Sequence, residues 1–306
     1  MDQGKAKSLV ATLCLCVLLF GTSWAGSARG RAEVLQAVPL PDVASVDWAL
    51  QVPDEPITLT GVVSFDNAGN GAGSMLYPAP HAVGLLAAIV THGIIESSMK
   101  RKQRDKLQEA ANQILVPYQP TLANYSNKDV ALAALARRPF GDRKSLVASP
   151  GAAATSWRIE STPRFSLTQD QRAFTLDNAI VLYSPGSTVP AYRTAVRVVS
   201  HPRDGVDFIS LWTADHGAEL KKEWGNLFAE SIDVALRTQA AKPGDGGAAF
   251  ETVRYSEGST QKIERAQPLY EECGRLVLKT LRGALMSVPA QAKADASVEA
   301  GICPHL

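Results

Sequence analysis

The sequence predicts an α+β protein in which an antiparallel sheet of hairpins packs against two or three long helices, preceded by a cleaved signal peptide. Segments with alternating apolar residues occur in pairs around turn residues, as in β-hairpins. Other segments place apolar residues three and four positions apart, as in amphipathic helices. No series of strand, helix and strand suggests a parallel sheet, so the α+β class is expected.

The first 25 residues have the pattern of a signal peptide. Lys5 and Lys7 precede an apolar run from Leu9 to Phe20, and small residues surround Ala25. A basic start, an apolar run and a small-residue cleavage site characterise export signals. Cleavage after Ala25 would leave 31 − 2 = 29 basic and 30 − 1 = 29 acidic residues. A net charge near zero provides no basic field for nucleic acid, so we expect no nucleic-acid partner.

Composition divides the rest of the chain. Residues 26–56 are proline-rich and predict an extended lead-in. Residues 57–290 contain the periodic segments and predict a single α+β domain, with a candidate sub-boundary at 140–155, where glycine, alanine and proline are frequent. Residues 291–306 predict a loose tail. A chain with 45% hydrophobic and 20% charged residues has the composition of a globular protein.

The first periodic stretch predicts a strand, a glycine loop and a long helix. The strand runs from Ile57 to Phe65, and the helix from about His81 to Tyr118. Its first half is apolar on nearly every side, which suits a buried helix or a membrane-facing one. We favour burial, because prolines and histidines dilute the roughly 20 apolar residues that a span needs. A membrane-inserted assembly component using residues 74–95 remains an alternative.

The central elements follow from caps and alternation. Ser126 is expected to cap a short helix that ends near Arg138. Alternation then predicts antiparallel strands over 156–168, with a break at Pro163, over 172–183 and over 192–199. We expect Val206, Phe208 and Trp212 to continue this meander.

The last third predicts helices on either side of a hairpin. Thr213 is expected to cap a helix from about Ala214 to Ala240, and residues 250–255 and 261–266 form a hairpin. A final helix is expected to begin at Pro268, with Cys273 on its apolar side.

One cluster of potential metal ligands stands out. Carboxylate and imidazole groups can hold zinc when they converge on one point. Their presence supports a metal-dependent hydrolase as a second alternative, although acidic groups at a helix start are also explained by the helix dipole. The candidate ligands are His201, Asp204, Asp207, Asp215, His216 and Glu219.

No motif predicts catalysis or a cofactor. The spacing of Gly69, Gly71 and Gly73 does not match a dinucleotide loop. Cys273 and Cys303, the two cysteines of the mature chain, are expected to form a disulfide that ties down the tail. The sequence therefore favours a non-enzymatic, periplasmic or secreted protein of the bacterial envelope that acts in binding or assembly, with another envelope protein as its partner.

Overall fold

The fold is built on a mixed sheet of ten strands, and it belongs to the α+β class. The computed structural model describes residues 46–63, 98–137, 143–148, 155–240 and 248–291, all within one compact unit that begins at Leu35. The strands are β1 (Trp48–Gln51), β2 (Leu59–Gly61), β3 (Lys144–Leu146), β4 (Trp157–Leu167), β5 (Phe174–Tyr183), β6 (Tyr192–Val199), β7 (Glu251–Glu257), β8 (Thr260–Glu272), β9 (Arg275–Thr280) and β10 (Leu285–Pro289). Their order is β3-β1-β4-β5-β6-β10-β9-β8-β7, and β2 also pairs with β4.

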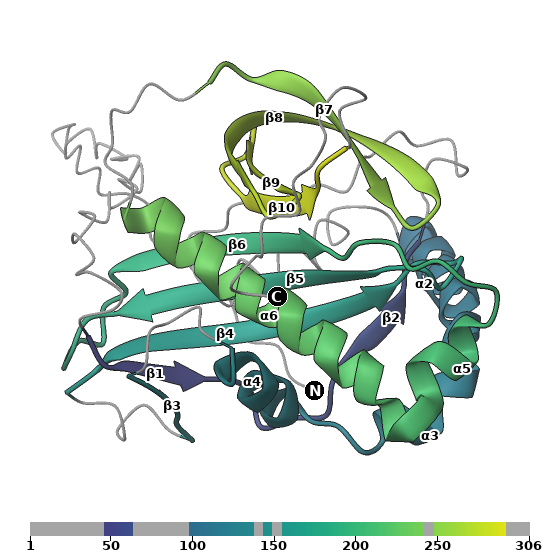
Figure 1. The fold of residues 1–306 in the computed structure, drawn as a ribbon, viewed down its shortest axis with the longest axis horizontal. Coiled ribbons are helices and arrows are strands. Elements are labelled where there is room, and N and C mark those ends of the chain that lie inside the picture. The colour runs from purple at the N-terminus through teal and green to yellow at the C-terminus, as the bar shows by residue number, and fades with distance from the viewer. Residues whose placement is uncertain (1–45, 64–97, 138–142, 149–154, 241–247, 292–306) are drawn as a thin grey trace, which may run out of the picture. The chain divides into compact units, whose positions relative to one another are not determined.

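Helix α6 lies against strands β5 and β6, and α4 packs on α6 (Figure 1). The helical elements are α2 (Ser98–Asn112), η3 (Gln113–Tyr118), α3 (Gln119–Leu122), α4 (Asn127–Leu135), α5 (Phe208–Thr213), η5 (Ala214–Gly217) and α6 (Ala218–Ala240).

The prediction of an antiparallel sheet was wrong. Strands β4, β5 and β6 are antiparallel, but β1 is parallel to β3 and β4, β2 to β4, and β10 to β6. A hairpin turn in the sequence predicts that the two strands beside it are antiparallel neighbours. The parallel strands here come from distant segments that no local turn connects, so no sequence signal predicts their pairing. Strand β1 also lies within the predicted lead-in, so the sheet includes part of that segment.

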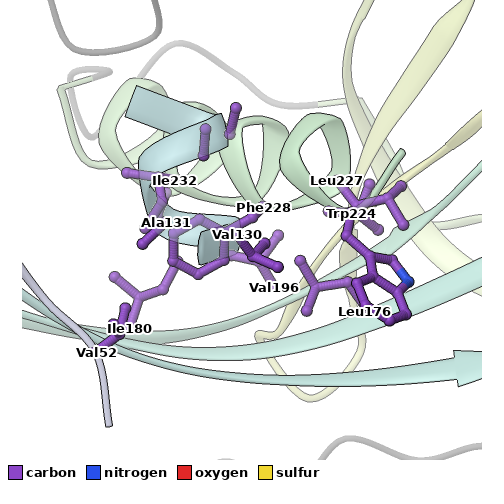
Figure 2. Packing of buried hydrophobic residues seen from close by; sticks show 14 of the residues in the cluster. Val52, Val130, Ala131, Leu176, Ile180, Val196, Trp224, Leu227, Phe228 and Ile232 are labelled. Atoms are coloured by element: carbon purple, nitrogen blue, oxygen red, sulfur yellow. The ribbon is translucent and has the colours of Figure 1, made fainter. Parts of the chain in front are cut away.

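The main core lies between α6 and one face of the sheet. Because successive residues of a strand point to opposite faces, every second residue of β5 reaches this core. Figure 2 shows Trp224 and Phe228 of α6 above Leu176, Ile180 and Val196 of the sheet, and Leu227 and Ile232 of the same cluster lie beside them.

A second, smaller apolar cluster lies on the opposite face, under the strands β7 to β10. It consists of Val199, Val253, Tyr255, Ala266, Leu278, Met286 and Val288. Strand β9 contributes to both clusters, since Val277 belongs to the main core while Leu278 belongs to the second.

The helix predicted from Pro268 is absent, because those residues form the end of β8, then β9 and β10. Leu276, Val277 and Leu278 form a short continuous apolar run in β9, and such a run cannot be distinguished from a buried helix by periodicity. Cys273 and Gly274, with φ of 53° and 68°, form the two-residue turn between β8 and β9. Positive φ at both positions is the signature of a type I′ hairpin turn.

Two boundaries near residue 210 were also wrong. Phe208 and Trp212 lie in helix α5, which Asp207 caps by accepting a hydrogen bond from the Ser210 amide (3.0 Å). Thr213 makes no side-chain cap, and α6 begins only at Ala218. Positive φ angles at Asp215 and His216 interrupt the helical path between α5 and α6.

Other predictions were confirmed where the chain is described. Ser126 caps α4, β5 pairs with β6, and β7 pairs with β8. Strand β4 continues through Pro163, which lies between the part of β4 that pairs with β1 and the part that pairs with β2. A proline fits there because its missing N–H is not needed by a neighbouring strand. The predicted signal peptide, the glycine loop and residues 74–95 lie outside the described residues.

Candidate functional site

The edge strands of the sheet differ in length and in how far other elements cover them. Edge strands expose unpaired backbone groups and are protected by short length, charges or covering elements. Strand β3 is only three residues long. The free side of β2 is covered by α2, where Asn112 Oδ1 accepts a hydrogen bond from the Gly61 amide (2.8 Å) and Gln108 Nε2 donates one to the Gly61 carbonyl (3.0 Å).

Strand β7 is the long edge. It pairs with β8 over its whole length, from Glu251 opposite Ala266 to Glu257 opposite Thr260. Among the described residues no strand pairs with its other side, and β7 ends the strand order. Every second residue of such a strand directs its N–H and C=O groups away from the sheet. The edge therefore offers a seven-residue backbone template.

The two faces of β7 differ in chemistry. Val253, Tyr255 and Glu257 are buried beneath the strand, whereas Thr252 and Arg254 are exposed. Burial raises the pKa of Tyr255 well above its usual value even though the charge of Arg197 lowers it, so this phenol stays neutral. An added strand would therefore lie beside an exposed face that carries Arg254 and a face whose apolar side chains are already buried.

The hairpin formed by Glu251 to Ala266, here called the arm, is held at its tip by Asp170. This contact is here called the latch. Asp170, in the turn between β4 and β5, accepts hydrogen bonds from the Ser259 amide (2.5 Å) and the Thr168 hydroxyl (2.5 Å). Burial of the Asp170 carboxyl favours protonation, but these hydrogen bonds outweigh it and lower the pKa. A Cβ on Gly258 would lie 2.5 Å from Asp170 Oδ1, so this close contact requires glycine.

An ion pair lies on the sheet face that also carries part of the second cluster. Arg197 donates to both carboxylate oxygens of Asp177, at 2.7 Å and 2.6 Å. Burial opposes the charge of Arg197, but Asp177 outweighs this effect and the guanidinium pKa rises. The two partners satisfy each other, and the charge of Arg197 is further favoured by Glu257 and Tyr255 of the arm.

The six metal candidates are not brought together. Asp204 Oδ1 lies 2.8 Å from Arg172 Nη2, and Asp207 caps α5. Glu219 Oε1 lies 3.7 Å from Lys222 Nζ. Within the described ranges, no three His, Cys, Asp or Glu side chains gather where an ion could be held. The remaining candidates are His201, Asp215 and His216, and the last two occupy the bend before α6.

His201 instead lies near a buried cluster of charged groups. Partial burial lowers the pKa of its imidazole, and Arg275 and Arg203 lower it further. Arg275 is 6% exposed and donates to the Ser287 hydroxyl (2.8 Å) and the Val199 carbonyl (2.8 Å). These bonds join β9, β10 and β6, so the cluster has a structural role.

One shallow pocket of about 320 Å³ lies at the start of α4. Asp54, Tyr125 and Asp129 are among the residues that line it. Two of its three carboxylates have partners, because Asp129 accepts from the Ser126 hydroxyl (2.6 Å) and Asp54 pairs with Lys128 (2.8 Å). The third belongs to Glu55, an exposed residue.

The predicted disulfide remains a prediction. Cys273 lies in the turn between β8 and β9, and Cys303 lies outside the described residues. The alternative based on residues 74–95 is likewise untested. In the part of the chain that the structure describes, no helix is long and apolar enough to cross a membrane.

Local sequence patterns predict the hairpin of β7 and β8 but not the position of β7 at the edge of the sheet. Alternation and the turn near Gly258 identify the two strands. The open side of β7 arises because β10, and not β7, pairs with β6, and β10 and β6 are far apart in the sequence. No family model, curated protein or solved structure matches this chain.

Proposed function

We propose that this protein is exported to the periplasm and acts there as a non-enzymatic binding or assembly component, with another envelope protein as its partner. The observation that carries the binding role is the open edge of β7, seven residues long and paired on one side only among the described strands. Proteins recognise extended chains at such edges through main-chain hydrogen bonds. The signal-peptide pattern of residues 1–25 supports the location.

Site-specific photo-crosslinking in cells tests the binding role. A photoreactive residue at Thr252, on the exposed face of the edge, should give discrete crosslinked products. The matched control carries the same group at Leu132, which is 55% exposed on α4. Equal crosslinking at both positions, or none at Thr252, would contradict a binding role for the β7 edge.

Fractionation tests the location separately. The mature protein should appear in the periplasm or the medium and begin near Gly26. Cytoplasmic protein that keeps Met1 would contradict export without affecting the result at the β7 edge.

A further inference from the structure

We propose that β7 receives an acidic, extended segment of another polypeptide as an additional strand. This inference rests on the proposed binding function and specifies the chemistry of the partner. Three features of β7 support it, namely the open edge, the charges on its exposed face and the poor fit of a second copy.

The exposed face of the arm is basic. In the registered pairs, Thr252 lies opposite Arg265, Arg254 opposite Ile263, and Ser256 opposite Gln261. Farther along this face, Lys279 of β9 is exposed and pairs with Gln267 of β8. Along β7 from 252 to 256 and β8 from 261 to 267, the alternate residues of this face include no Asp or Glu. Opposite charges in directly facing strand positions are favourable, and like charges are not.

Apolar side chains accompany these charges. Ile263 is 61% exposed and lies on the same face, directly opposite Arg254. On the opposite face of β7, Val253 and Tyr255 are 6% and 4% exposed and belong to the second cluster. A strand with acidic residues on one side and apolar residues on the other would place its acidic side beside Arg254 and extend the apolar face of the sheet, because side chains alternate along an extended chain.

A second copy of this chain fits the edge poorly. Antiparallel pairing of two β7 strands centred on Arg254 would place Arg254 opposite Arg254 and Glu251 opposite Glu257. A shift of two residues would place Arg254 opposite Thr252 or Ser256, so it would still find no acidic partner directly opposite. Like charges therefore disfavour the centred dimer, and the shifted pairings give Arg254 no facing carboxylate.

The test uses the mature protein and an eight-residue peptide that alternates glutamate and valine and is blocked at both ends. Binding should slow hydrogen exchange at backbone amides of β7. Two further peptides carry N-methyl groups on every second residue. In the first peptide they block the amides of one edge, and in the second they block the amides of the opposite edge. Strand addition uses one edge of the peptide, so one of these two should lose binding at least tenfold while the other retains it.

Two variants with the same change of charge separate edge pairing from general attraction. Arg254→Glu should weaken binding at least tenfold, because it places an acidic group directly opposite the peptide's carboxylates. Lys279→Glu, two strands farther from the edge at about 4.8 Å per strand, should weaken it less than threefold. A peptide with lysine in place of glutamate should bind at least tenfold more weakly. Equal loss in both variants, or slowed exchange outside β7, would overturn the inference.

The outcomes also separate this inference from the proposed function. Crosslinks at Thr252 together with no binding of the acidic peptide would reject the partner's acidic character and leave the binding role intact. Concentration-dependent dimerisation that slows exchange of the β7 amides and prevents peptide binding would identify a second copy as the occupant and overturn the acidic partner. Stronger peptide binding after removal of residues 292–306 would identify the chain's own tail as a competitor, and binding that requires that tail would overturn the proposal.

Discussion

Ser126 illustrates a residue whose role is local and therefore predictable. Its side chain accepts from the Asp129 amide (3.4 Å), while the Ser126 amide donates to Asp129 Oδ2 (2.8 Å). This reciprocal arrangement is a capping box in which aspartate takes the usual place of glutamate. Both partners lie three residues apart, so the sequence contained all the required information.

Replacement of Ser126 by alanine should lower the free energy of unfolding by about 1 kcal/mol, because the first amides of α4 lose an acceptor. Ser126→Thr keeps the hydroxyl and should lose less than half of that. Chemical denaturation of the three proteins measures both changes. An unaltered midpoint for Ser126→Ala would show that α4 does not need its cap.

Gly61 has a role that the sequence did not reveal, because it depends on a helix 50 residues away. A Cβ built at Gly61 would lie 2.0 Å from the carbonyl oxygen of Ala111 in α2. Gly61→Ala should therefore push α2 away from β2 and break the bonds from Gln108 and to Asn112, at a cost of several kcal/mol.

Thermal melting should show a clearly lower Tm for Gly61→Ala than for Gly283→Ala. A Cβ at Gly283 would meet nothing within 4 Å, but the φ of 82° there strains an alanine, whereas Gly61 has no positive φ. This control therefore measures backbone strain without a steric clash. Equal losses of Tm would show that the clash between Gly61→Ala and α2 costs no more than that strain.

The arm is an element held at both ends, and its tip depends on Asp170. Because hydrogen bonds hold the folded pKa of Asp170 below its unfolded value, the carboxylate stabilises the fold above the unfolded value of about 3.9. This stabilisation is lost as the pH falls through the lower folded pKa. The latch is therefore fully effective at neutral pH.

Asp170→Ala should destabilise the protein at pH 7 by about 1 to 2 kcal/mol, since the Ser259 amide and the Thr168 hydroxyl lose their acceptor. The difference between wild type and variant should shrink as the pH approaches 3. Urea unfolding at both pH values measures it, and hydrogen exchange should report faster opening of the tip of the arm. A difference that is independent of pH would contradict the ionised latch.

The turn between β8 and β9 shows what sequence periodicity missed at the scale of elements. Apolar residues recur around Cys273 and predict a helix there, yet the left-handed φ of Cys273 and the following Gly274 define a hairpin. Two-residue turns with an asparagine or aspartate before glycine are easily recognised, whereas cysteine in the first position is not part of that pattern.

The predicted bond from Cys273 to Cys303 would anchor the tail at this turn. Peptide mapping of exported protein without reductant should recover the two cysteines in one linked fragment. In the chain-entropy model, a loop of this size stabilises the fold by about 3 to 4 kcal/mol, so Cys273→Ser should lower the Tm. Two free thiols in the mature protein would contradict the pairing.

The whole molecule depends on contacts between segments far apart in the sequence. Local patterns identified β5, β6, the arm and much of α6, and their antiparallel pairs have short connections. They did not identify the insertion of β10 beside β6 or of β1 beside β4, because those pairings join segments about 90 and 110 residues apart. The open edge of β7 is a consequence of this long-range order, so no local pattern could show it.

Trp224 joins the layers of this molecule and provides the test of its core. It is fully buried on α6, with ring centroids 5.2 Å from Phe165 of β4, 5.9 Å from Phe174 of β5 and 6.4 Å from Tyr125 before α4. Trp224→Ala should remove about 3 to 5 kcal/mol from the free energy of unfolding, because it deletes a large side chain and leaves a cavity among these rings.

Val206→Ala is the matched surface control, since Val206 is 100% exposed and should change the stability by less than about 0.5 kcal/mol. Far-ultraviolet circular dichroism during urea unfolding measures both variants without depending on tryptophan fluorescence. A loss below 1 kcal/mol for Trp224→Ala would show that α6 does not hold the sheet through this residue, and the packing of α6 on β4 and β5 would then have to be revised.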